Sequence, residues 1–126
     1  SVGVTRVSTS PSSTLEAVLN AVEVGLEGAV SDLAAVSGDA SLCYLSRSGG
    51  PVSGVKYHEG RVSALRELRR GCRRGEQESL ERTLREWRAE QERYEDRPGT
   101  DPWKAYRTGG VDALLTVSEA VSPDAT

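Results

Sequence analysis

Residues 55–96, VKYHEGRVSALRELRRGCRRGEQESLERTLREWRAEQERYED, decide the fold because the charge of this stretch changes sign half-way along. The first half carries seven basic residues against two carboxylates, and the second half carries eight carboxylates against four arginines. Apolar residues recur at helical spacing in both halves. The stretch therefore predicts two neighbouring helices of opposite charge, 55–74 and 76–96, divided near Gly71 and Gly75. An antiparallel pair could neutralise itself, or the basic helix could face a partner.

One further helix is predicted on each side of this stretch. Residues 102–121 begin with Pro102 and are preceded by Asp101, a pair that is typical of an N-cap with proline at the first helical position. Residues 14–37 carry apolar side chains at i, i+3, i+4 and i+7 without a break. This stripe consists of Leu15, Val18, Leu19, Val22, Leu26, Ala29, Val30 and Leu33.

Glycines interrupt the first and last of these predicted helices. Each glycine inside a helix costs about 1 kcal/mol relative to alanine. For Gly25 and Gly28, two explanations are open: close approach by the backbone of another helix, or simple tolerance of the cost. We expect the Gly109-Gly110 pair either to bend the last helix or to split it in two.

The whole pattern predicts an all-α chain, a small four-helix bundle-like domain spanning residues 14–122. Residues 1–13 are rich in Ser and Thr with few large apolar groups, so we expect a flexible N-terminal tail. Residues 123–126 are expected to be a second, short tail. Between the first two helices, residues 39–54 predict a long loop, because the Ser, Gly and Pro residues at 48–54 favour turns.

Composition excludes some classes of protein and suggests a location. A net charge of −3 argues against an indiscriminate polyanion binder. No apolar run approaches a membrane span and nothing resembles a signal peptide, so we expect a cytoplasmic protein. Cys43 in the loop and Cys72 at a helix end are separated by about 30 Å of helix, which predicts two free thiols. With no Phe or Met in the chain, the core is thin, and self-association is expected to cover more apolar surface.

Residues that carry catalysis or bind cofactors form no recognisable constellation. His58 is the single histidine, and no second histidine or Cys-x-x-Cys pair completes a metal site. Ser48–Pro51 is glycine-rich but lacks the frame of a phosphate-binding loop. We therefore predict no enzyme, no metal and no cofactor. An enzyme that uses His58 with Glu59 or Cys43 is the least favoured alternative.

The arginine face of residues 55–74 is the strongest candidate for contact with a partner. Three of its arginines lie at i, i+4 and i+7, a ridge that suits phosphates or an acidic protein. Trp103 and Tyr106, near the start of the last predicted helix, are candidates for either the core or an interface. The residues predicted to contact a partner are Arg66, Arg69, Arg70, Arg73, Trp103 and Tyr106.

Two classes of function remain open beside the enzyme. The favoured hypothesis is a non-catalytic helical component of an assembly that binds a protein partner, most simply a second copy of itself. The alternative is a small regulator that binds nucleic acid through Arg66, Arg69, Arg70 and Arg73. Internal neutralisation of the arginines by the acidic helices would count against the alternative, whereas an open ridge would favour it.

Overall fold

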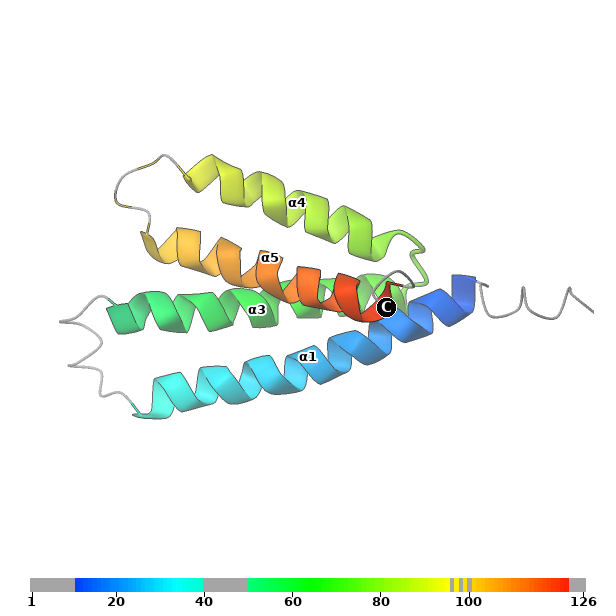
Figure 1. The fold of residues 1–126 in the computed structure, drawn as a ribbon, viewed down its shortest axis with the longest axis horizontal. Coiled ribbons are helices and arrows are strands. Elements are labelled where there is room, and N and C mark those ends of the chain that lie inside the picture. Colours follow the sequence, from blue (N-terminus) through cyan, green and yellow to red (C-terminus); the bar gives the residue numbers. More distant parts are fainter. Residues whose placement is uncertain (1–10, 40–49, 96, 98, 100, 123–126) are drawn as a thin grey trace, which may run out of the picture.

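The computed structural model describes residues 11–39, 50–95, 97, 99 and 101–122. They form four α-helices: α1 (Pro11–Asp39), α3 (Gly50–Arg73), α4 (Ser79–Tyr94) and α5 (Asp101–Val121), shown in Figure 1. The predicted all-α, four-helix, bundle-like fold is confirmed. Residues 1–10 and 123–126 of the predicted tails and residues 40–49 of the predicted loop lie outside the described part. No helix of the described part is both long and apolar enough to cross a membrane.

Two helices begin earlier than the sequence predicts. Helix α1 starts at Pro11, so residues 11–13 belong to a helix and not to a tail. Helix α3 starts at Gly50, which places the turn-type residues 51–54 inside the helix. Both corrections have one cause: the first helical turn needs no backbone N–H donors, so proline is tolerated there. Pro51, which favours a turn in isolation, lies in the first turn of α3.

The helices form a flattened bundle built on a central pair (Figure 1). Helices α3 and α5 run parallel and share the most extensive interhelical contact, with α1 on one side of the pair and α4 on the other. Within the bundle, the two diagonal helices α3 and α5 touch directly, and contact between α1 and α4 is marginal at most.

Two glycines bring α3 and α5 together. A Cβ atom on Gly60 of α3 would overlap the backbone carbonyl of Tyr106 on α5. A Cβ atom on Gly109 of α5 would overlap the backbone carbonyl of Tyr57 on α3. Each helix therefore contributes a Tyr-x-x-Gly segment whose glycine packs on the backbone of the other helix. Helix α5 runs without interruption through Gly109-Gly110, so the pair neither splits it nor ends it.

A single hydrophobic core joins all four helices. On α1, steps of three or four residues place the predicted stripe inward, but Val30 is 45% exposed. On α4, Leu80 and Trp87 are buried as the apolar spacing predicts. The Trp87 ring lies against Gly110, where a Cβ would collide with it. The buried core consists of Val18, Val22, Leu26, Ala29, Val62, Ala64, Leu65, Leu68, Cys72, Leu80, Trp87, Val111, Ala113, Leu114 and Val117.

The turn between α3 and α4 is tight and is held by charge. Gly75 has φ +79°, a left-handed conformation that favours glycine. Glu76 then pairs with Arg74 at 2.8 Å and also with Arg82, so one carboxylate joins the end of α3 to α4. These two hydrogen bonds lower the pKa of Glu76 to about 2. Because the turn uses the residues up to Glu78, α4 begins at Ser79 and not at residue 76.

Candidate interaction surface

The four predicted arginines do not form one open ridge. Arg69 and Arg73 reach across to Glu23 of α1, with N–O distances of 3.4 Å and 3.3 Å. Arg66 and Arg70 are exposed and form no ion pair with another described residue. The acidic helix that neutralises half of the ridge is therefore α1, and not the acidic helix α4 that follows α3 in the chain.

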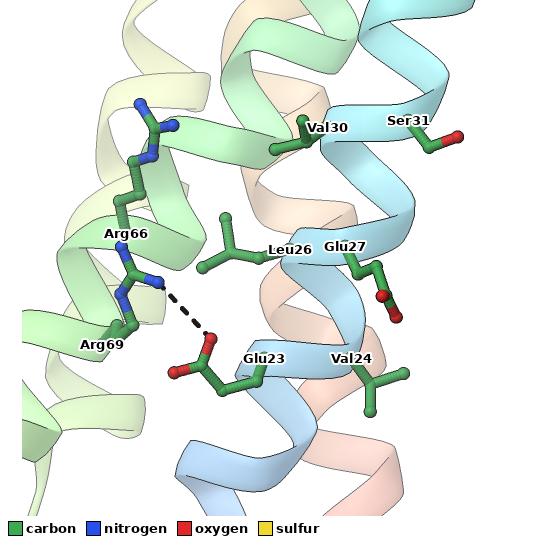
Figure 2. A pocket seen from close by; sticks show the side chains of 8 residues that line it. All are labelled: Glu23, Val24, Leu26, Glu27, Val30, Ser31, Arg66 and Arg69. Atoms are coloured by element: carbon green, nitrogen blue, oxygen red, sulfur yellow. Dashed lines mark hydrogen bonds and ion pairs between the residues drawn. The ribbon is translucent and has the colours of Figure 1, made fainter.

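A shallow groove of about 640 Å³ runs between α1 and α3 beside these arginines. In Figure 2, Glu23, Leu26 and Val30 point from α1 toward α3, and Val24 lies on the outer side of α1. Leu26 is buried, whereas Val24 is 71% exposed and Val30 is 45% exposed. The residues that line the groove are Glu23, Val24, Leu26, Glu27, Val30, Ser31, Arg66 and Arg69.

Opposite charges lie side by side along this surface. Helix α1 contributes Glu23 and Glu27, both exposed; Glu23 pairs with Arg69 and Arg73 of α3, and Glu27 forms no ion pair with a described residue. Helix α3 contributes Arg66 and Arg70, whose guanidinium groups form no ion pair within the described part of the chain. The result is an acidic strip on α1 and a basic strip on α3, with the partly exposed Val30 between them (Figure 2). We call this face, comprising the groove lining and Arg70, the α1–α3 surface.

The two predicted aromatic contact residues lie elsewhere and differ from each other. Trp103 is 50% exposed, and its ring meets the Tyr106 ring edge-on at 5.8 Å. The Nζ atom of Lys56, near the start of α3, lies 5.2 Å from the Trp103 ring centroid. Tyr106 is half-buried between Trp87, at 5.4 Å, and the guanidinium of Arg107, also at 5.4 Å. Tyr106 is therefore largely a core residue, and Trp103 remains available for contact.

A second groove, which the sequence analysis missed, lies between α1, α3 and α5. Its volume is about 440 Å³. Tyr57 of α3 donates a hydrogen bond to the Asp112 carboxylate of α5 at 2.6 Å. Burial, followed by the hydrogen bond and charge of Asp112, raises the pKa of Tyr57 to about 12. The residues that line this second groove are Ala21, Val24, Gly25, Tyr57, Arg61, Leu65, Asp112, Ala113, Thr116, Val117 and Ala120.

The residues weighed for catalysis are engaged in ordinary polar contacts. Arg61 Nη1 donates to Nδ1 of His58 at 2.9 Å and to Asp32 of α1 at 2.8 Å. Glu59 pairs with Lys56 at 3.1 Å. Within the described ranges, no group of three or more His, Cys, Asp or Glu side chains could hold a metal ion.

The structure describes Cys72 but not Cys43. Cys72 is a free, buried thiol, and burial raises its pKa. A thiol with a raised pKa is a poor nucleophile, because the thiolate is the reactive form. Cys43 lies outside the described residues, so its predicted free thiol and its pairing with His58 stay predictions.

Two surfaces thus carry the chemistry of the described part: the charged α1–α3 surface, and the three-helix groove with Tyr57 and Asp112. Each combines exposed apolar area with charged groups that form no ion pair with a described residue. No protein-family model, no curated protein and no solved structure matches this chain.

Proposed function

We propose that this protein is a non-catalytic assembly component that self-associates through the α1–α3 surface. One observation carries the proposal: Glu27 of α1 and Arg66 of α3 line the same groove with their charges unpaired among the described residues. Val24 and Val30 add exposed apolar area beside them. A surface with both charges and an apolar centre is the kind that can complement a copy of itself.

A two-fold axis along the groove would satisfy these charges. Such an axis places α1 of each copy over α3 of its partner, without a shift along the helices. Because Glu27 and Arg66 line the same groove from opposite helices, we expect each Glu27 to face the basic strip of the other copy that contains Arg66. The interface is isologous, so every contact forms twice. An arrangement with α3 of one copy over α3 of the other would instead place the arginines of the two copies face to face, where they repel each other.

The expected association is weak and sensitive to salt. Full burial of a valine side chain contributes about 1.5–3 kcal/mol, and Val24 and Val30 are already partly covered. Four valines in a dimer therefore contribute a few kcal/mol, against an association cost of at least about 4 kcal/mol. The charge pairs decide whether a dimer forms, and exposed pairs are screened by added salt.

Charge reversal followed by its rescue tests the proposal. Sedimentation velocity over a range of protein concentrations should show association of the native chain, and Arg66→Glu or Glu27→Arg alone should weaken it. The double variant should restore association, because the pair is rebuilt with its charges exchanged. Arg88→Glu, on the exposed face of α4, is the matched control and should have no effect. A strictly monomeric native chain, or a double variant no better than either single one, would refute the proposal.

The same variants separate this proposal from its alternatives. Binding of nucleic acid through the arginines would be lost in Arg66→Glu, and the addition of Glu27→Arg would not restore it to the native affinity. Engagement of Arg69 and Arg73 by Glu23 weighs against that alternative. Trp103→Ala should leave self-association unchanged, because Trp103 lies outside the α1–α3 surface. The expected cytoplasmic location is part of the proposal and is supported by the free thiol of Cys72.

A further inference from the structure

The three-helix groove has a polar end and an apolar end. Tyr57, Arg61 and Asp112 come from the first half of α3 and the middle of α5. Toward the other end, helices α1 and α5 contribute only small or aliphatic side chains and one threonine. These residues are Ala21, Val24, Gly25, Ala113, Thr116, Val117 and Ala120. A volume of about 440 Å³ falls in the range of sites for small organic ligands.

The charges at the polar end are not balanced. The guanidinium of Arg61 is neutralised by Asp32 at 2.8 Å, and this hydrogen bond lowers the pKa of Asp32. Asp112 accepts a hydrogen bond from the neutral hydroxyl of Tyr57 and forms no ion pair with a described residue. One carboxylate charge in the groove is therefore left without a cation.

We propose that the three-helix groove binds an amphipathic organic cation, a protonated amine carried on an apolar chain. The ammonium group would pair with the Asp112 carboxylate, whose second oxygen and outer lone pairs are free of protein donors in the described part. The chain would lie between α1 and α5 along the exposed lining residues Val24, Thr116 and Ala120. Leu65, which contacts the Gly25 position, closes the groove beneath them, so a chain there replaces water above an apolar floor without moving a polar group.

The geometry disfavours an anionic ligand of the same shape. A carboxylate at the polar end would face Asp112 directly. It could use Arg61 only in competition with Asp32. The sign of the ligand charge is thus a specific consequence of the proposal, and it does not depend on the proposed self-association.

Titration of the full chain with three ligands of equal chain length tests the proposal. We expect n-octylamine to bind saturably in calorimetry and to shift the backbone amide NMR signals of residues that line the groove. Octanoate and octan-1-ol should bind at least about tenfold more weakly, because a charge-assisted hydrogen bond is lost or replaced by repulsion. Equal binding of octanoate, or no saturable binding of n-octylamine, would overturn the proposal.

Variants locate the binding in the groove. Asp112→Asn keeps an acceptor for Tyr57 and removes the charge, so affinity for n-octylamine should fall by about tenfold or more. Glu119→Gln, an exposed carboxylate on α5 outside the groove lining, is the matched control and should leave affinity unchanged. Ala21→Phe should abolish binding by filling the apolar end. Circular dichroism confirms that each variant is folded, and unchanged affinity in folded Asp112→Asn would overturn the assignment.

Discussion

Alanine at Gly60 should destabilise this protein, although alanine is the better helix former. In an unhindered helix, Gly→Ala contributes about 1 kcal/mol of stability. At Gly60 the new Cβ would overlap the carbonyl of Tyr106, which is backbone and cannot rotate away. Overpacking a well-packed contact costs about 1–3 kcal/mol, and the upper end applies where two helices must separate. The expected net loss for Gly60→Ala is therefore about 2 kcal/mol.

Gly28 supplies the control within the same chain. It is exposed in α1, and an added Cβ would meet nothing within 4 Å. Gly28→Ala should therefore stabilise the fold by about 1 kcal/mol, the full helix-propensity gain. Urea denaturation followed by circular dichroism measures both variants. A difference of about 3 kcal/mol between them is expected, and equal stabilities would refute the close contact between α3 and α5.

The reciprocal glycine adds a test of mechanism. Gly109→Ala should cost about as much as Gly60→Ala, because each Cβ meets a backbone carbonyl across the same helix pair. Once one substitution has forced the helices apart, the second should cost less, so the double variant should lose clearly less than the sum of the singles. Strict additivity would show that the two glycines act at independent places.

Three further predictions concern the polar and aromatic contacts of the fold. Glu76→Gln should be less stable than the native chain at pH 6. That difference should vanish as the pH falls from about 4.5 to about 2 in urea titrations, because a lowered folded-state pKa stabilises only above the unfolded pKa. Trp87→Phe should cost about 1–3 kcal/mol in the same assay, since it removes both core volume and the 3.0 Å hydrogen bond from Trp87 Nε1 to Glu67. In a Cys43→Ser background, Cys72 should react with a thiol reagent far more slowly in the native state than in urea, because burial raises its pKa.

The sequence was sufficient for the helices and for their buried faces. On α1, Val22 and Leu26 are buried where the helical period places them, and on α4 the same holds for Leu80 and Trp87. Gln91, four residues after Trp87 on α4, donates a hydrogen bond to Thr108 of α5 at 3.2 Å. A 3.6-residue period determines which side of a helix is apolar. That side becomes buried regardless of which helix packs against it.

The sequence was not sufficient to predict which helices contact each other. A glycine in a helix is equally compatible with tolerance, a bend or a close contact, and only the opposite surface decides among them. Gly28 is tolerated in open space, while Gly60 and Gly109 allow a crossing of backbones. The repeated Tyr-x-x-Gly spacing in α3 and α5 was the available signal, and it requires knowing that the two helices are neighbours.

The second groove was beyond the sequence for a related reason. Tyr57 and Asp112 are 55 residues apart, so no local spacing rule brings them together. Arginine spacing did locate Arg66 and Arg70 on an exposed face. It could not show that Glu23 of α1 would occupy Arg69 and Arg73, because that pairing depends on the register between α1 and α3.

The three-helix groove depends on the glycine contact between α3 and α5, because its lining includes residues of both helices. When these diagonal helices touch, α1 rests on the pair as an outer helix and is bordered by a groove on each flank. Val24 lines both grooves and is 71% exposed. Separation of α3 from α5 in Gly60→Ala should therefore widen the three-helix groove and weaken binding of n-octylamine. Self-association should survive in the folded variant, because the α1–α3 surface contains no residue of α5.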